Sequence, residues 1–126
     1  MEEGKHDIET EEDVKLLIDS FYGKVLTDPI IGHIFTEIAK IDLEEHLPKL
    51  YAFWGMLLLG TPGYHGQPLT PHLPLGLKTE HFVRWLQLFD QTLKEHFKGL
   101  NAELAIQKAQ NIARLWNHKL NGNPLS

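Results

Sequence analysis

The sequence predicts an all-α protein, and three observations support this fold class. Apolar residues recur every three or four positions in four separate segments, which is the spacing of one helix face. No segment shows the sustained alternation of apolar and polar residues that is typical of a strand. The 126 residues are 42% hydrophobic and 23% charged, so we expect one domain with one core, spanning 1–126. Only the ends, at 1–9 and 121–126, are expected to be flexible.

The first predicted helix runs from about Glu11 to Leu26. Thr10 and Asp13 have the spacing of a capping pair at its start. Asp28-Pro29 ends it, because the residue before a proline disfavours helical backbone angles. One further helical turn is expected between Ile30 and Phe35. The apolar face of the first helix consists of Val14, Leu17, Ile18, Phe21, Tyr22 and Val25.

The second predicted helix runs from about Asp42 to Leu59. Asp42 and Glu45 form another capping signature, and Gly60 fits the position just past the helix end. The spacing of its apolar face places a histidine among core residues. That face consists of His46, Leu50, Phe53, Trp54 and Leu57.

The helical pattern stops between Gly60 and about Lys78, a segment with four glycines and four prolines. His65 and His72 both lie in it. Irregular segments of this length in small domains usually have a functional reason.

Two more helices complete the predicted fold. One runs from about Thr79 to Phe97 and ends at Gly99. The other runs from about Ala102 to Leu120, and Asn101 is predicted to cap it. Their faces consist of Phe82, Trp85, Leu86, Phe89, Leu93 and Phe97, and of Ala105, Ala109, Ile112, Ala113, Trp116 and Leu120.

Composition excludes several classes of function. The formal net charge of −5 disfavours nucleic acid and anionic membranes as partners. The absence of cysteine excludes disulfides, thiolate metal sites and covalent haem attachment through cysteine. Eight histidines remain as candidate ligands for a transition metal. No apolar run is long enough to span a bilayer, and the first residues are polar, so we expect a cytoplasmic protein.

Polar groups on the apolar faces point to a ligand pocket. Tyr22, His46 and Trp85 come from three different helices, and each buried polar group requires a hydrogen-bond partner. Taken singly, each is an ordinary boundary or core residue.

Zinc-protease, nucleophile-elbow and phosphate-loop motifs are absent, and the Glu-His pairs at 80–81 and 95–96 lack di-iron spacing. A haem site needs one histidine on a loop, an apolar cleft between aromatic-rich helices, and a few polar groups on the far side of the cleft. The sequence offers all three. A haem-free helical interaction module stays possible.

Four segments carry a resemblance to a known family. Phe53 to Gly60 reads F-W-G-M-L-L-L-G, and Tyr64 to Leu69 reads Y-H-G-Q-P-L, with His72 three residues further on. Phe21 to Val25 reads F-Y-G-K-V, and Phe82 to Leu86 reads F-V-R-W-L. Together these segments resemble the group III truncated haemoglobins. The resemblance covers about 7–120, and the glycine pairs of groups I and II are absent.

The resemblance implies a two-over-two helical sandwich that holds non-covalent haem b, iron protoporphyrin IX. It implies that His72 is the proximal iron ligand and that Tyr22, His46 and Trp85 are the distal residues. Phe35 matches the phenylalanine that packs on the porphyrin. Pro48 departs from the family pattern beside His46, so whether His46 points into the pocket is left open. Leu50, Phe53 and Trp54, on the helix face of His46, are also expected to contact the haem.

The expected function is binding of O₂, CO, NO or similar small diatomic ligands at a His-ligated iron. Peroxidase-like or NO-detoxifying chemistry at the same haem is the alternative, because a polar distal pocket serves both. Such a cycle needs an external reductase, since no reductase domain is present in the sequence.

Overall fold

The computed structural model describes residues 5–38, 43–62 and 77–121. Within these ranges the regular elements are helices, as the sequence predicts. They are α1 (Glu11–Val25), the short π-helix η1 (Ile34–Ile38), α2 (Leu43–Leu59), α3 (Thr79–His96) and α4 (Leu100–Asn121). Within the described residues, none of them is long and apolar enough to cross a membrane.

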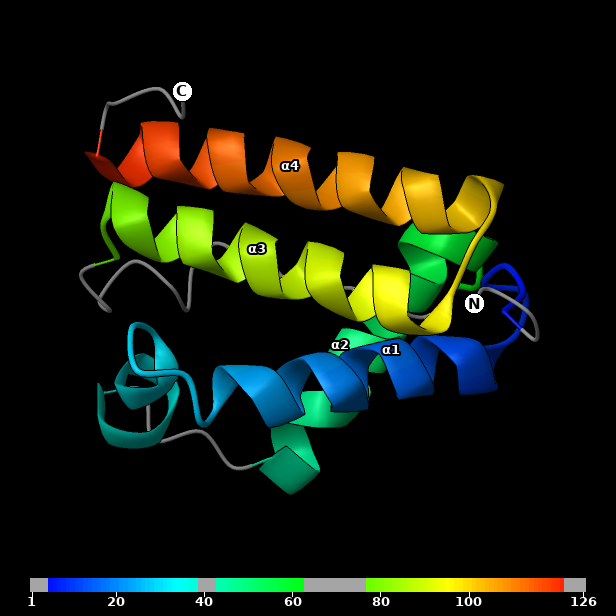
Figure 1. The fold of residues 1–126 in the computed structure, drawn as a ribbon, viewed down its shortest axis with the longest axis horizontal. Coiled ribbons are helices and arrows are strands. Elements are labelled where there is room, and N and C mark those ends of the chain that lie inside the picture. Colours follow the sequence, from blue (N-terminus) through cyan, green and yellow to red (C-terminus); the bar gives the residue numbers. More distant parts are fainter. Residues whose placement is uncertain (1–4, 39–42, 63–76, 122–126) are drawn as a thin grey trace.

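The four long helices form two layers (Figure 1). In one layer α3 and α4 run antiparallel and pack side by side. In the other layer α1 and α2 cross each other and are also in contact. Contacts of α1 with α3 and of α2 with α4 join the layers. Each pair of helices thus covers the apolar faces that the other pair would otherwise expose to water.

The first helix agrees closely with its prediction. Oγ1 of Thr10 accepts a hydrogen bond from the backbone N–H of Asp13 at 3.2 Å, and the Asp13 carboxylate accepts one from the backbone N–H of Thr10 at 3.1 Å. These two bonds satisfy donors that a helix start leaves without partners. All six residues of the predicted apolar face are buried: Val14, Leu17, Ile18, Phe21, Tyr22 and Val25.

The corner after α1 is organised by Asp28. Its carboxylate accepts hydrogen bonds from the backbone N–H groups of Ile30 at 3.0 Å and Ile31 at 3.1 Å. It also accepts two bonds from Arg84 of α3, at 2.9 Å from Nε and 2.6 Å from Nη2. The predicted helical turn leading into Phe35 is present: the backbone is helical from Gly32 and continues as η1, and the residues before Gly32 form the capped corner.

The second helix begins and ends near its predicted bounds. It continues through Pro48, which is exposed. Gly60 has φ +70°, which confirms the predicted left-handed position just past the helix end. The predicted cap Asp42 lies outside the described residues. Trp54 is the first buried residue of α2 in the part whose side chains are described.

The start of α4 corrects the sequence prediction. The helix begins at Leu100, so Asn101 lies inside its first turn and does not cap it. The carboxylate of Asp7 caps it, because its oxygens accept hydrogen bonds from the backbone N–H groups of Asn101 at 2.8 Å and Ala102 at 2.9 Å. A cap supplied from more than 90 residues away leaves no local signal at the helix start.

Residues 5 to 8, which we expected to be flexible, pack onto this corner. Ile8 is 0% exposed, and its carbonyl accepts a hydrogen bond from Nδ2 of Asn101 at 2.7 Å. The backbone carbonyl of His6 accepts a bond from the N–H of Lys98 at 3.1 Å. Gly99 has φ +140°, and a Cβ added there would lie 2.5 Å from Cγ of Asp7. Glycine is therefore required where this segment crosses the α3–α4 corner.

Polar side chains around the buried Asn117 join the start of α3 to the end of α4. Oδ1 of the buried Asn117 accepts hydrogen bonds from Oγ1 of Thr79 at 3.0 Å and from Nδ2 of Asn121 at 2.8 Å. Asn121 also donates to the carbonyl of Leu77 at 3.0 Å. These bonds fix the backbone where the chain enters α3.

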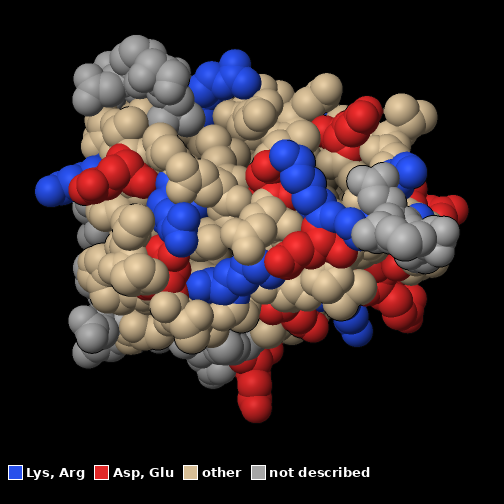
Figure 2. Space-filling model, viewed as in Figure 1, with Lys and Arg blue, Asp and Glu red and all other residues tan. Residues whose placement is uncertain are grey.

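Charges of both signs are interspersed on the face that Figure 2 shows. Among the described residues, Lys24 of α1 forms an ion pair with Glu95 of α3 at 2.6 Å. Lys94 pairs with Asp90 within α3 at 2.9 Å. Exposed pairs of this kind each contribute little to stability.

Candidate functional site

A tyrosine and a histidine from two helices meet inside the fold. The hydroxyl of Tyr22 on α1 lies 3.2 Å from Nε2 of His46 on α2, which is hydrogen-bond distance. Tyr22 is 7% exposed and His46 is half-buried. The sequence left the direction of His46 open, and the structure orients its ring toward Tyr22 despite Pro48 two residues further on.

The chemistry of this pair follows from its surroundings. Burial raises the pKa of Tyr22 far above its ordinary value, so the hydroxyl stays protonated at neutral pH. A neutral phenol can donate to an unprotonated Nε2 or accept from a protonated one. The pair can thus present a hydrogen-bond donor to a third, polar partner within a largely apolar environment.

Aromatic rings surround Tyr22 on several sides. Phe35 packs edge-on against it, with ring centroids 5.7 Å apart, and Phe21 does so at 5.6 Å. Phe21 also contacts Trp85 of α3 at 5.8 Å. The three predicted distal residues, Tyr22, His46 and Trp85, therefore belong to one continuous cluster of side chains.

A stack of rings supports this cluster from the core. Trp85 stacks on the buried Phe89, with centroids 5.6 Å apart and planes 10° from parallel. Trp54, which is 3% exposed, also stacks on Phe89, at 4.9 Å. Phe53 packs edge-on against Trp54 at 5.7 Å. Trp54 is thus part of the core, and Phe53 lies beside it.

Several apolar side chains around this cluster are only partly buried although they pack against the core. They come from η1, α2 and α3, and a flat apolar group lying against them would remove more of their surface from water. This surface and the nearby Tyr22–His46 pair fit a haem, which is largely apolar and needs polar groups only near its iron. The partly buried residues are Phe35, Leu47, Leu50, Phe53, Leu57, Trp85 and Leu86.

The predicted proximal ligand, His72, lies outside the described residues, as does His65. The sequence prediction for both therefore stays a prediction. The described chain resumes at Leu77, directly before α3.

Another histidine pair lies elsewhere. His33 and His81 have ring centroids 6.5 Å apart, and Nδ1 of His81 accepts a hydrogen bond from the backbone N–H of Lys78 at 2.9 Å. Burial lowers the pKa of His81, so its ring favours the neutral form. No group of three potential metal-ligating side chains occurs in the part of the chain that the structure describes.

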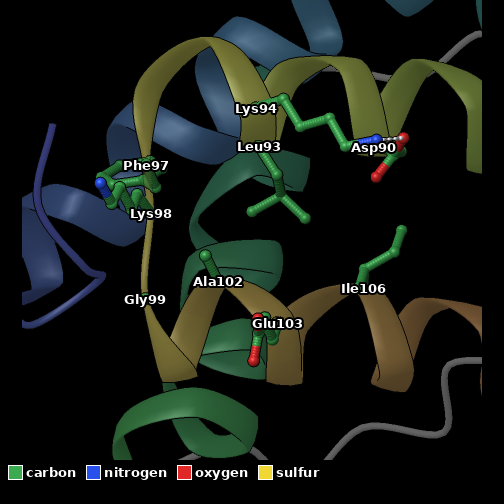
Figure 3. A pocket seen from close by; sticks show the side chains of 9 residues that line it. All are labelled: Asp90, Leu93, Lys94, Phe97, Lys98, Gly99, Ala102, Glu103 and Ile106. Atoms are coloured by element: carbon green, nitrogen blue, oxygen red, sulfur yellow. Dashed lines mark ion pairs between the residues drawn. The ribbon is translucent and has the colours of Figure 1, made fainter. Parts of the chain in front are cut away.

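A shallow open cleft of about 210 Å³ lies at the α3–α4 corner (Figure 3). Leu93 and Phe97 of the α3 end and Ala102 and Ile106 of α4 line it, with Asp90 and Lys94 at its edge. None of these residues belongs to the Tyr22 cluster.

Sequence reasoning missed two long-range contacts. One is the pair of Asp28, in the corner after α1, with Arg84 of α3, and the other is a hydrogen bond from the Tyr51 hydroxyl of α2 to the Asp19 carboxylate of α1. Neither has a local signature, because the partners lie 56 and 32 residues apart and charged or polar residues on helix surfaces usually face water.

The fold and the site define this protein as an all-helical truncated globin. The family model for bacterial-like globins matches residues 6–121, and the chain belongs to this family as a group III truncated haemoglobin. It is 38% identical over 107 residues to the group 3 truncated hemoglobin ctb of Campylobacter jejuni, which covers 82% of this chain and 84% of that protein. It is 32% identical over 99 residues to the group 2 truncated hemoglobin YjbI of Bacillus subtilis, with coverage of 75% and 70%.

A solved structure supports the same conclusion. The crystal structure of the group III truncated hemoglobin from Campylobacter jejuni superposes with a TM-score of 0.83 at 33% identity, covering 92% of this chain and 94% of that one. The predicted family and globin-like fold class are therefore confirmed, and the family is one of haem-binding globins.

Proposed function

We propose that this chain is a haem b protein that binds O₂ and other small diatomic ligands at an iron ligated by His72. The observation that carries the proposal is the partly buried Tyr22–His46 hydrogen bond beside partly buried aromatic side chains. A polar pair that is sheltered from water next to an apolar surface is the arrangement expected where a mostly apolar cofactor binds a small polar ligand. Membership in a haem-binding globin family supports it further.

The residues divide into those that hold the haem and those that act on its ligand. Phe35, Leu50, Phe53 and Trp85 offer apolar surface for the porphyrin, and Trp54 supports them from the core. His72 would bind iron as neutral imidazole, and its second ring nitrogen would donate to a backbone carbonyl. A haem held by a single imidazole would leave its iron able to bind a small diatomic ligand.

The distal residues would stabilise a ligand that gains negative charge. The Tyr22 O–H and the Trp85 Nε1–H are donors, and each well-aligned bond contributes roughly 1–3 kcal/mol in a water-poor site. His46 orients the Tyr22 hydroxyl through their mutual hydrogen bond. The same histidine can control access to the pocket by turning away from Tyr22.

Absorbance spectra test this proposal directly. The purified chain reconstituted with haem is expected to show a Soret band in the ferric and ferrous forms, and that band should shift when CO is added. His72→Ala should weaken haem retention or change these bands, whereas His65→Ala, a matched change in the same segment, should leave them intact. Absence of haem binding by the unmodified chain would refute the cofactor assignment. Unchanged spectra in His72→Ala would refute the ligand assignment alone.

Redox chemistry at the same haem is the second candidate function. Peroxidase-like turnover and NO detoxification both use a polar distal pocket, and the Tyr22–His46 pair favours them as much as reversible binding. Stopped-flow mixing with peroxide, and NO consumption by the oxygenated protein, separate these activities from simple binding. An external reductase would have to return the iron to its ferrous state. A haem-free interaction module, which the residues alone also allowed, is disfavoured by the family.

A further inference from the structure

A second hydrogen bond joins α1 to α2 on the outer side of the Tyr22–His46 pair. The Tyr51 hydroxyl donates to the carboxylate of Asp19, and the Lys15 ammonium lies 5.6 Å from the centre of the Tyr51 ring. Burial and the bond to Asp19 raise the pKa of Tyr51 to about 12, so the donor keeps its proton at neutral pH. The contact is therefore a charge-assisted hydrogen bond.

The position of this bond relates it to the candidate site. Asp19 lies three residues before Tyr22 on α1, and Tyr51 lies five residues after His46 on α2. Residues three apart on a helix share one side of it, so Asp19 and Tyr22 both face the neighbouring α2. The two hydrogen bonds are thus consecutive links between the same two helices.

The first half of α2 is less buried than its second half. From Glu44 to Phe53 its side chains are exposed or half-buried, and Trp54 is the first to be buried. Pro48 lies in this half and has no N–H to donate to the preceding turn. Apolar burial and intrahelical bonding therefore hold this half less firmly than the half that follows Trp54.

We propose that Tyr51 and Asp19 form a positioning clamp that holds the first half of α2 at the distance from α1 that the Tyr22–His46 hydrogen bond requires. Neither residue contacts the candidate ligand position; both act through His46. The functional meaning of the clamp rests on the proposed function, since it sets the geometry of the proposed distal pair. The effect of the Tyr51–Asp19 bond on the Tyr22–His46 bond does not require bound haem.

Three variants of the full chain test the clamp. Tyr51→Phe removes the hydroxyl and keeps the ring beside Lys15. Asp19→Asn keeps an oxygen acceptor at the same place without the charge, so it should weaken the link but not abolish it. Lys49→Gln is the matched control, because it breaks an exposed ion pair with Glu45 at 3.6 Å that lies on α2 and does not involve α1.

The readouts are the ¹⁵N chemical shift of His46 Nε2 and the exchange rate of the Tyr22 hydroxyl proton. Both are measured by NMR on the protein as it purifies, as the diamagnetic ferrous CO complex if it holds haem. In Tyr51→Phe we expect the His46 shift to move toward that of a free imidazole. Hydroxyl exchange should accelerate about threefold to tenfold, which corresponds to the net contribution of one hydrogen bond. Asp19→Asn should lie between the unmodified protein and Tyr51→Phe, and Lys49→Gln should match the unmodified protein.

Two results would overturn the clamp: unchanged His46 and Tyr22 signals in Tyr51→Phe, or equal changes in Tyr51→Phe and Lys49→Gln. If Tyr51→Phe does not fold, Asp19→Ala takes its place, because it removes the acceptor of the same hydrogen bond and keeps the Tyr51 ring. It should change the two signals in the direction expected for Tyr51→Phe, and unchanged signals contradict the proposal. Failure to bind haem or CO contradicts the proposed function and leaves this comparison intact.

Discussion

The Tyr22 hydroxyl lies 3.2 Å from Nε2 of His46, although 24 residues separate the two in sequence. Two helices of one layer bring them together, and the bond is sheltered by Phe21 and Phe35. A buried phenol with a single polar partner can form a further bond to a small ligand without being displaced by bulk water. The first prediction follows from this relationship.

Replacing Tyr22 by phenylalanine should accelerate O₂ dissociation from the haem-loaded protein by about tenfold, because one lost donor bond of about 1.4 kcal/mol is a factor of ten. Stopped-flow displacement of O₂ by CO measures the rate. Thr27→Val, which removes an exposed hydroxyl just beyond the end of α1, serves as the control and should leave the rate unchanged. Equal rates in Tyr22→Phe and the unmodified protein would remove Tyr22 from this role.

The Asp28–Arg84 pair predicts a pH dependence of stability. Hydrogen bonds from Arg84, and then from the backbone of Ile31 and Ile30, hold the pKa of Asp28 below its usual range. The folded-state pKa thus lies below the unfolded value of roughly 3.9. The carboxylate contributes its full stabilisation above the unfolded value, and that contribution is lost as pH falls through the folded value.

We therefore expect Asp28→Asn to lower Tm by a constant amount between about pH 7 and pH 5, and the difference from the unmodified protein to shrink below about pH 4. Thermal unfolding followed by circular dichroism at several pH values measures this. Asp90→Asn, which breaks an exposed pair on α3, should change Tm little at any pH. A difference for Asp28→Asn that stays constant down to pH 2 would contradict the assigned cause.

The cap that Asp7 provides to α4 predicts a stability effect at a residue far from that helix in sequence. Asp7→Ala removes the acceptor of the Ile8, Asn101 and Ala102 backbone donors and should cost about 2 kcal/mol, the upper range for a lost helix cap. Denaturant unfolding gives the free energy, and amide hydrogen exchange at Asn101 and Ala102 locates the effect. Gln107→Ala, an exposed change on the same helix, should be nearly neutral. Unaltered exchange at Asn101 in Asp7→Ala would show that the cap contributes nothing.

Two glycines near the first corner predict opposite effects of the same substitution. Gly23 is exposed in α1, and a Cβ there meets nothing within 4 Å, so Gly23→Ala should stabilise the protein by about 1 kcal/mol through helix propensity. A Cβ at Gly32 would lie 2.9 Å from the carbonyl oxygen of Leu26, so Gly32→Ala should destabilise it. Tm values of the two variants provide the measurement. A higher Tm for Gly32→Ala would mean that the corner can relax.

Local sequence features determined most of the helix bounds. The Thr10–Asp13 capping box, Gly60 past the end of α2 and the three-to-four residue periodicity act within one or two helical turns, so they can be read without knowledge of the fold. The motifs around Tyr22, Trp54 and Trp85 likewise resemble the group III truncated haemoglobins on the residues alone, and the comparisons confirm the family.

Only the tertiary structure decided which polar side chains meet. The direction of His46, the Asp7 cap, the Asp28–Arg84 pair and the Tyr51–Asp19 bond all join partners at least 24 residues apart. Periodicity specifies which face of a helix is buried, but it contains no information on the angle and register at which two faces pack. Those two quantities set whether a polar group at the edge of a face finds a partner or water, and they depend on the whole core.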